Sequence, residues 1–189
     1  MFNLPNLLTW LRILLIPVFV AVFYVSDAVL PAHSRNVVAT LLFALAAITD
    51  WLDGYLARAL KQTSAFGAFL DPVADKLMVA AALVVLVEFG RVHALIALII
   101  IGREIAISAL REWMARIGET RSVAVSVAGK VKTGTQMAAI LLLLYHDPLL
   151  FGLSAHALGT VLIYIAAGLT LWSMLYYLKA AMPRALSRP

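Results

Sequence analysis

Long apolar stretches run along the whole chain, separated by short breaks that carry charged residues, proline or glycine. Each stretch is close to the ~20 residues that an α-helix needs to cross ~30 Å of hydrocarbon. Six stretches can be traced, over Leu7–Val25, Val37–Leu60, Gly67–Glu88, Val92–Met114, Val125–Tyr145 and Ala157–Leu178. The pattern predicts an all-α polytopic membrane protein, a bundle of six transmembrane helices that forms a single domain over residues 1–189.

The composition supports lipid as the surrounding medium. Of the 189 residues, 63% are hydrophobic and 13% are charged, whereas a soluble domain is about half apolar and about a quarter charged. Cysteine is absent, which excludes disulfides, thiolate metal sites and cysteine nucleophiles. The net charge of +5 arises from basic residues that flank apolar stretches. We therefore expect anionic lipid headgroups and phosphate-bearing substrates as partners, and no nucleic acid.

The basic residues are shared unevenly between the two sets of helix ends. One set carries Arg35 and Arg91. The other set carries Arg58, Lys61, Arg116, Arg121, Lys130, Lys132, Lys179, Arg184 and Arg188. Because basic residues concentrate on the cytoplasmic side of membrane proteins, both termini are predicted to lie in the cytoplasm.

Four aspartates lie inside the second and third apolar stretches, near the predicted cytoplasmic ends. Acids in such helices are costly, and they usually face a partner or a wet cavity. Asp50 and Asp53 are ~60° apart around one helix, and Asp71 and Asp75 recur after four residues on one face of the next. The short connection makes these helices antiparallel neighbours. The two carboxylate pairs are therefore predicted to meet across one helix–helix interface.

Four carboxylates in one partly desolvated site repel each other and require neutralisation. An all-oxygen set suits hard cations such as Mg²⁺ or Mn²⁺, and two such ions would balance the charge and clamp a diphosphate. Small residues and a guanidinium on the same helix faces leave room for a phosphate ligand; they are Gly54, Ala57, Gly67 and Arg58. The alternative is that the aspartates form internal salt bridges with Arg58, Lys61 and Lys76.

The spacing of these residues resembles that of a known family. The run Asp50–Arg58, followed by Gly67, Asp71 and Asp75, matches the signature of the CDP-alcohol phosphotransferases at every fixed position. Further stretches are similar to one bacterial branch of that family, which makes phosphatidylglycerophosphate. These stretches are residues 6–12, 70–76, 103–104, 108–113 and 129–133, so the resemblance extends over most of the chain.

The resemblance implies a six-helix bundle in the cytoplasmic (inner) membrane, usually homodimeric, with its active site open to the cytoplasm. It implies transfer of a phosphatidyl group from CDP-diacylglycerol to glycerol 3-phosphate, with release of CMP. The residues that it implies as metal ligands are Asp50, Asp53, Asp71 and Asp75. Asp75 would also be the catalytic general base. The residues that would accommodate the CDP moiety are Gly54, Ala57, Arg58 and Gly67.

A phosphate-bearing acceptor needs cationic partners. The candidate acceptor pocket consists of basic residues in or beside the cytoplasmic half of the fourth and fifth stretches: Arg111, Lys130, Arg103 and Lys132. The alternative is that they set the membrane topology or pair with Glu104 and Glu112. In the first stretch, Asn6, Thr9 and Arg12 either border the nucleotide site or form a polar helix start from which Arg12 snorkels to the interface.

Two competing interpretations remain open. The aspartate signature is expected to bind only the donor. Other acceptors, such as inositol phosphate, serine or phosphatidylglycerol, are therefore also compatible with it. Buried acids also mark ion paths, as in a cation transporter. Transporters often contain inverted repeats and need access from both faces. This chain shows no similarity between its halves, and its acids lie near one predicted face.

Overall fold

Helices form nearly all of the structure. The computed structural model describes residues 4–59, 65–116, 127–149 and 152–186. These residues form helices α1 (Leu4–Val22), α2 (Ala32–Ala59), α3 (Ala65–Glu88), α4 (Ala94–Arg116), α5 (Val127–Tyr145) and α6 (Ala155–Leu186). The only β-type pairing among the described residues is an isolated bridge between Pro148 and Ser154. The all-α prediction is confirmed.

Several helix ends differ from the predicted ones because hydrogen bonding, and not hydropathy, ends a helix. α1 ends at Val22. Two hydrogen bonds that span only three residues follow it, from the amide of Phe23 to the carbonyl of Val20 and from the amide of Tyr24 to the carbonyl of Ala21. α2 starts five residues before the predicted Val37, and the carbonyl of Pro31 accepts from the amide of Arg35 at 2.9 Å. The first turn of α2 is polar, so hydropathy alone left it out of the predicted helix. α6 continues beyond the predicted Leu178 to Leu186 for the same reason.

Two described helices are long and apolar enough to cross a membrane, over Ala32–Leu52 and Ala155–Lys179. The described parts of α1 and α5 contain shorter apolar stretches, Leu7–Val22 and Val131–Tyr145. α3 and α4 carry more charge in their cavity-facing halves. Six spans therefore stay a prediction, while two are supported by length and composition.

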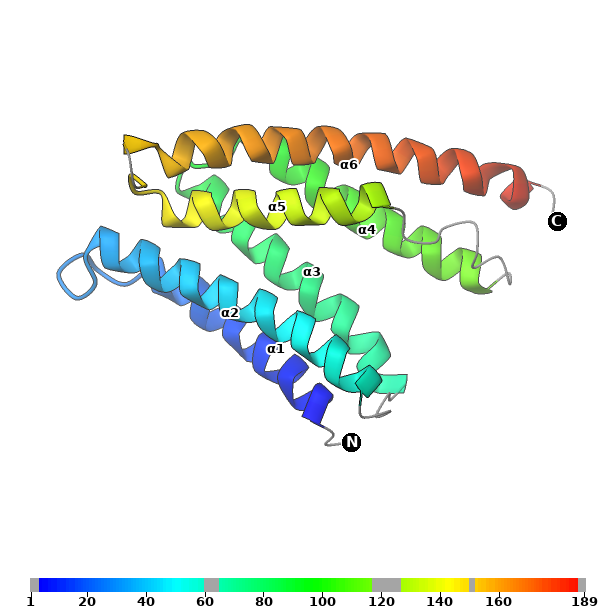
Figure 1. Ribbon diagram of the computed structural model, residues 1–189, viewed down its shortest axis with the longest axis horizontal. Coiled ribbons are helices and arrows are strands. Elements are labelled where there is room, and N and C mark those ends of the chain that lie inside the picture. Colours follow the sequence, from blue (N-terminus) through cyan, green and yellow to red (C-terminus); the bar gives the residue numbers. More distant parts are fainter. Residues whose placement is uncertain (1–3, 60–64, 117–126, 150–151, 187–189) are drawn as a thin grey trace.

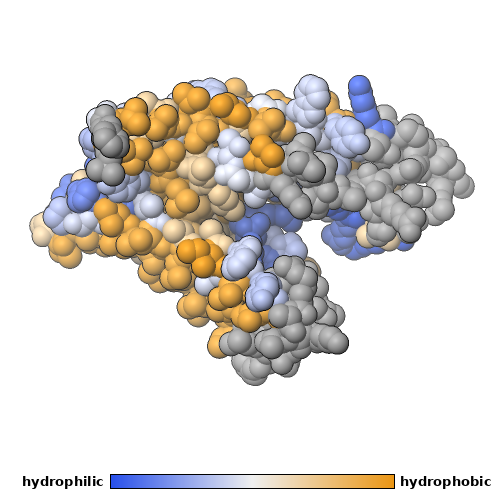
Figure 2. All heavy atoms as spheres, in the orientation of Figure 1, coloured by the Kyte–Doolittle hydropathy of each residue, from blue (hydrophilic) through white to orange (hydrophobic). Residues whose placement is uncertain are grey.

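Large apolar side chains cover the outside of several helices. Leu98 is 67% exposed and Trp172 is 72% exposed. Figure 2 shows hydrophobic residues over much of the visible face of the molecule. Apolar coverage on this scale is unusual for a soluble monomer and suits contact with lipid or with another protein.

The helices form two groups, the N-terminal arm (α1–α3) and the C-terminal arm (α4–α6). α1 packs on α2 and α3, α6 packs on α4 and α5, and the arms meet where α2 touches α5 and α3 touches α4. In Figure 1 the arms converge where α1, α3 and α5 finish, here called the closed end. They diverge toward the open end, which carries both termini. An even number of antiparallel helices brings the start of α1 and the end of α6 to this same open end, on different arms.

The main hydrophobic core joins the two arms near the closed end. It includes Phe19, Phe43 and Leu83 from the N-terminal arm, with Ile100 and Leu143 from the C-terminal arm. A separate small cluster, Ile107, Met114 and Tyr177, lies within the C-terminal arm toward the open end. The arms are thus fixed together at one end by apolar packing and are held apart at the other, which leaves space for a polar cavity.

Polar contacts reinforce the closed end. Arg91 donates from Nη1 to the carbonyls of Leu143 and Leu144 at 3.1 and 2.9 Å, and from Nη2 to Asn36 Oδ1 at 2.7 Å. These carbonyls belong to the last turn of α5, where helical partners run out. His146 follows with a φ of 61°, the left-handed conformation that often ends a helix. The connection between α3 and α4 therefore caps α5 and also contacts α2.

Candidate active site

A polar cavity of about 570 Å³ lies between the arms toward the open end. It is lined by Asp50, Asp71, Pro72, Asp75, Lys76, Arg103, Glu104, Ile107, Ser108, Arg111, Lys132, Thr133 and Tyr177. Figure 2 shows the same region as a hydrophilic hollow between the arms. α2 and α3 provide one wall, and α4, α5 and α6 provide the other.

One wall is acidic. Asp50 on α2 and Asp71 and Asp75 on α3 all line the cavity, so the structure brings together three of the four aspartates that the spacing placed at one interface. The backbone of Asp53 lies on α2, but its side chain lies outside the described residues. Among the side chains that are described, no three His, Asp or Glu groups are close enough to form a metal site by themselves.

α1 holds two of these carboxylates. Arg12 donates from Nη1 to Asp50 Oδ1 at 2.5 Å, and Thr9 donates from Oγ1 to Asp71 Oδ1 at 2.5 Å. Thr9 is fully buried and Arg12 is 1% exposed. The snorkelling interpretation of Arg12 is therefore wrong, because an acid on the neighbouring helix draws the guanidinium inward. Sequence analysis missed this ion pair, although the spacing of Thr9 and Arg12 on one helix face was a signal for it.

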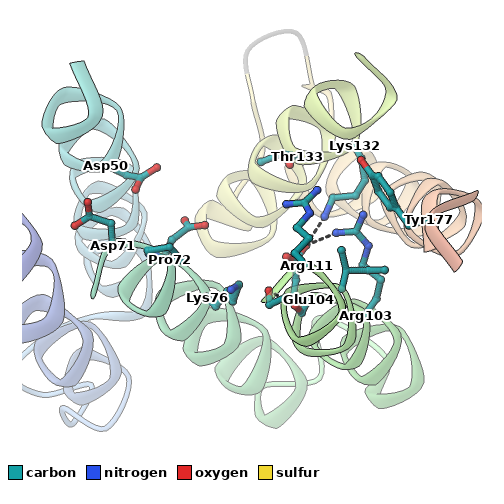
Figure 3. Close-up of a pocket in the computed structure, with 13 residues that line it drawn as sticks. Asp50, Asp71, Pro72, Lys76, Arg103, Glu104, Arg111, Lys132, Thr133 and Tyr177 are labelled. Carbon is teal, nitrogen blue, oxygen red and sulfur yellow. Dashed lines mark hydrogen bonds and ion pairs between the residues drawn. The ribbon is translucent and has the colours of Figure 1, made fainter. Parts of the chain in front are cut away.

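The other wall is basic. Arg103 and Arg111 from α4 and Lys132 from α5 line it, and Figure 3 shows their side chains across the cavity from Asp50 and Asp71. Lys130 lies two residues before Lys132 on α5, and its side chain lies outside the described residues. Three of the four predicted acceptor residues therefore share a cavity with three of the predicted metal ligands.

The ring of Tyr177 on α6 supports both arginines of this wall. The guanidinium carbons of Arg111 and Arg103 lie 5.3 and 5.9 Å from the centroid of this ring. Tyr177 itself is 1% exposed. Such contacts favour a cation in a fixed position. Arg103 also donates to Ser173 Oγ at 2.9 Å. No sequence pattern indicated a role for Tyr177 or Ser173, since α6 is far from α4 along the chain.

Glu104 is the acid of this wall. Lys132 Nζ contacts Glu104 Oε1, and Arg103 Nη1 lies 3.4 Å from the same oxygen. The alternative that the basic residues pair with Glu104 thus holds for Lys132 and Arg103. No ion pair of Arg111 occurs among the described side chains. Arg111 is therefore the cation of this wall whose charge is not already matched by a described carboxylate.

The signature residues beyond the aspartates occupy the ends of the two acidic helices. Gly54, Ala57 and Arg58 lie in the last turns of α2, with side-chain surroundings outside the described residues. Gly67 is buried in the first turns of α3. Asn6 lies in the first turn of α1. The backbone therefore places the residues predicted to bind CDP beside the acidic wall.

A sequence profile described as CDP-alcohol phosphatidyltransferase matches residues 2–172. The chain belongs to the CDP-alcohol phosphatidyltransferase family. The resemblance carried by the spacing of Asp50, Asp53, Asp71 and Asp75 is thereby confirmed.

Curated relatives match over nearly the full chain. A protein from Pseudomonas fluorescens is 54% identical over 185 residues, which cover 96% of this chain and 91% of the relative. Proteins from Haemophilus influenzae and Pectobacterium atrosepticum are each 52% identical over 182 residues, covering 95% of this chain and 94% or 95% of theirs. All three carry the name CDP-diacylglycerol–glycerol-3-phosphate 3-phosphatidyltransferase.

Proposed function

We propose that this protein is a phosphatidylglycerophosphate synthase, an enzyme that transfers the phosphatidyl group of CDP-diacylglycerol to glycerol 3-phosphate and releases CMP. The observation that carries the proposal is sequence identity. Relatives of that name are more than half identical to this chain over about 95% of its length. The cavity supports it, because an acidic wall and a basic wall face each other across one space.

The acidic wall fits a divalent-metal centre. The donor set offered by Asp50, Asp71 and Asp75 consists only of carboxylate oxygens, the ligands that Mg²⁺ and Mn²⁺ prefer. Together with Asp53 these residues would hold two ions. When bound, the ions would offset negative charge on the diphosphate and on departing CMP. The CDP moiety would lie against Gly54, Ala57, Arg58 and Gly67, with Asn6 and Thr9 at the border.

Asp75 is the proposed catalytic base. Its carboxylate lines the polar cavity as part of the acidic wall. An alcohol is a weak nucleophile at neutral pH, and a carboxylate within reach of its proton raises the rate. Asp75 accepts the hydroxyl proton of the acceptor while the oxygen attacks the phosphorus that carries diacylglycerol. The bond between that phosphorus and the CMP oxygen breaks, so charge and atoms balance.

The basic wall is the proposed site of the acceptor phosphate. Arg111, Arg103 and Lys132 carry three positive charges, and Glu104 removes one. A remaining charge of about two matches a phosphate monoester, which carries about −1.5 to −2 at neutral pH. Arg111 offers the first contact because its charge is unmatched among the described side chains, with Lys130 beside the pocket on α5.

This charge balance also ranks the alternative acceptors. Serine carries no phosphate and phosphatidylglycerol carries only a singly charged phosphodiester, so both would leave charge on the basic wall unmatched, whereas inositol phosphate would match it as well as glycerol 3-phosphate does. The acids line a cavity toward the open end of the bundle. This position favours an enzyme over a cation transporter, because a transporter needs access from both faces.

The proposed setting is the cytoplasmic (inner) membrane, crossed six times by a single domain, with both termini and the cavity on the cytoplasmic side. The polar cavity lies toward the end that carries both termini and the greater number of basic residues. A homodimer is proposed from the resemblance to the family. This arrangement lets a soluble acceptor enter from water while the lipid donor stays in the membrane.

The test is formation of phosphatidylglycerophosphate and CMP by the purified protein in detergent. Both products are expected when CDP-diacylglycerol and glycerol 3-phosphate are present with Mg²⁺, and neither after chelation. Asp75→Asn is expected to lower kcat by about 10²–10⁴-fold, the usual contribution of a general base, when Mg²⁺ is kept saturating.

The matched control is Asp27→Asn, which changes an acid at the closed end that is 74% exposed and pairs with Arg35. It should leave turnover unchanged. Release of CMP at the same rate with serine, or full activity after removal of divalent metal, would contradict the proposal.

A further inference from the structure

The outer face of α6 carries a hollow that is separate from the polar cavity. Its volume is about 240 Å³, and the described residues that line it are Trp172, Leu175, Tyr176 and Lys179. None of these four residues lines the polar cavity. Trp172 is 72% exposed and Tyr176 is 61% exposed. The proposed reaction gives this α6 hollow no role.

Lys179 indicates the depth of the α6 hollow in the proposed membrane. It is the last residue of the apolar span Ala155–Lys179, so its ammonium lies at the predicted level of the cytoplasmic headgroups. Trp172 lies ~10 Å further along the helix toward the hydrocarbon, and Tyr176 lies between the two. The hollow therefore extends from the level of the lipid phosphates to the upper part of the acyl chains.

The charge of Lys179 is unmatched in the part of the chain that the structure describes. Its side chain is exposed, and no described carboxylate forms an ion pair with it. By contrast, Arg116 at the same end of the bundle pairs with Glu112 at 2.6 Å. An unmatched ammonium beside an apolar hollow is complementary to a lipid that has a negatively charged headgroup.

The same turns of α6 carry residues that hold the basic wall of the polar cavity. Ser173 and Tyr177 are buried on the inner face of the helix. Ser173 accepts a hydrogen bond from Arg103 at 2.9 Å, and the ring of Tyr177 lies against Arg103 and Arg111. Tyr176 on the outer face contacts Tyr177, with 6.0 Å between the ring centroids. A ligand that packs on Tyr176 therefore also restricts the ring that supports both arginines.

We propose that the α6 hollow binds an anionic phospholipid, and that this lipid raises the affinity of the polar cavity for its acceptor. The headgroup phosphate pairs with Lys179, and the upper part of an acyl chain lies against Trp172 and Leu175. The bound lipid orders the turns of α6 that hold the basic wall, so less ordering remains for the acceptor phosphate to impose. The lipid site stands by itself, whereas its effect on the acceptor rests on the proposed function.

The choice of occupant follows from the combination of charge and apolar surface. A zwitterionic lipid brings its own cation, so Lys179 adds little to its binding. A free phosphate ion would use Lys179 and make no contact with the apolar side chains. An apolar helix of another protein would cover these side chains and leave the ammonium unmatched. An anionic phospholipid satisfies both parts of the hollow.

The first test measures binding of phosphatidylglycerol to the protein in detergent by native mass spectrometry. Lys179→Gln is expected to raise the dissociation constant of the tightest phosphatidylglycerol site about fivefold, the effect of one lysine on an anionic headgroup. Binding of phosphatidylcholine should not change. Arg116→Gln is the matched control, because it removes a positive charge at the same end of the bundle outside the hollow. Equal losses in the two variants, or no loss in Lys179→Gln, would overturn the lipid site.

The second test measures acceptor kinetics in phosphatidylcholine nanodiscs with and without phosphatidylglycerol. In the unaltered protein, phosphatidylglycerol is expected to lower the KM for glycerol 3-phosphate about fivefold, the lower end of typical coupling between sites. Arg116→Gln should keep this response and Lys179→Gln should lose it. Phosphatidylserine, which has the same net charge, should act in the same way. Glycerophosphoglycerol, the headgroup without acyl chains, should have no effect, and a response to it would contradict a lipid as the occupant.

Tyr176→Leu separates lipid binding from its effect on the acceptor. The variant keeps Lys179, Trp172 and an apolar side chain in the hollow, and it removes the ring that contacts Tyr177. It should bind phosphatidylglycerol as the unaltered protein does and show a smaller change in the KM for glycerol 3-phosphate. A full response in Tyr176→Leu would overturn the proposed route through Tyr177.

The two proposals fail in different ways. If no phosphatidylglycerophosphate forms under any condition, the proposed function fails, and mass spectrometry still decides whether the hollow binds anionic lipid. If the product forms with the same acceptor KM in both kinds of nanodisc, the proposed function stands and the regulatory role of the α6 hollow fails.

Discussion

Arg12 is a full positive charge enclosed within the acidic wall. Its side chain is 1% exposed and contacts Asp50 at 2.5 Å. A guanidinium in this position neutralises a carboxylate that is also proposed to bind metal, and a divalent cation near Asp50 would be repelled by it. We therefore expect Arg12 to stabilise the metal-free protein and to oppose metal binding at the proposed site. The balance between these effects would set the metal affinity of that site.

Arg12→Gln is expected to raise the affinity for Mn²⁺ by about tenfold, within the 5–150-fold range of typical coupling between sites, and to lower the melting temperature of the metal-free protein. Arg12→Lys keeps the charge and should retain the weaker affinity. Titration of Mn²⁺ by electron paramagnetic resonance and melting with and without metal measure both effects. An unchanged dissociation constant in Arg12→Gln would contradict this role.

At the residue scale, the sequence predicted the positions of the aspartates well and the side-chain contacts between distant helices poorly. Asp50, Asp71 and Asp75 could be placed together because helical spacing and a short connection fix which faces of two successive helices meet. Arg12 and Tyr177 act across helices that are distant in the sequence. Their contacts depend on how the arms pack, which no local pattern specifies.

At the scale of elements, the end of α5 is where charge and backbone conformation act together. His146 has a positive φ, and its ring lies against His156 with 4.8 Å between the ring centroids. Burial lowers the pKa of His146 below its usual value, and the nearby positive charge of Arg91 and the ring of His156 lower it further, while Asp147 opposes the shift. The neutral imidazole is thus the form that suits the folded protein.

This depressed pKa predicts a loss of stability in acid. The unfolded chain binds a proton at His146 near pH ~6.5, whereas the folded protein binds it only at lower pH. The stabilisation is therefore complete above about pH 6.5 and declines as the pH falls through the interval between the two pKa values. The variant His146→Asn should show a weaker decline, because asparagine tolerates the left-handed conformation and has no titrating group.

Apparent melting temperatures in detergent between pH 7.5 and pH 5.5 measure this effect. His93→Asn is the matched control, since that histidine is exposed at the same end of the molecule. Parallel pH profiles for the unaltered protein and His146→Asn would show that another group is responsible.

The helices themselves were largely predictable. Stretches of about 20 apolar residues placed all of the helices, and only their ends shifted, as at Pro31 and beyond Leu178. Hydropathy reports where a helix is apolar, while the hydrogen-bonded helix continues into polar residues. The divergence of the arms was not predictable, because it follows from where the shared apolar core stops.

At the scale of the whole molecule, the proposed orientation in the membrane can be tested directly. The chain has no cysteine, so single cysteines introduced at exposed positions report on one site each. Ser26, between α1 and α2, lies at the closed end, and Ala115, in the last turn of α4, lies near the open end. A membrane-impermeant maleimide should label Ser26→Cys in intact spheroplasts and Ala115→Cys only after the membrane is permeabilised.

The unaltered chain is the blank for this experiment. The reversed labelling pattern would place the cavity on the outer side of the membrane and contradict the proposed supply of acceptor from the cytoplasm. Labelling of both positions in sealed cells would contradict a helix bundle that spans the membrane between them.

The divergence of the two arms also has a mechanical consequence. The groups proposed for the donor belong to one arm and those proposed for the acceptor to the other, while the apolar joint lies at the far end. From Ala94 to Arg111, α4 is a lever of ~25 Å, so a tilt of about 5° at its base moves the guanidinium by about 2 Å. The separation of the two proposed reactants would consequently be governed by apolar packing at the closed end of the bundle, away from the cavity.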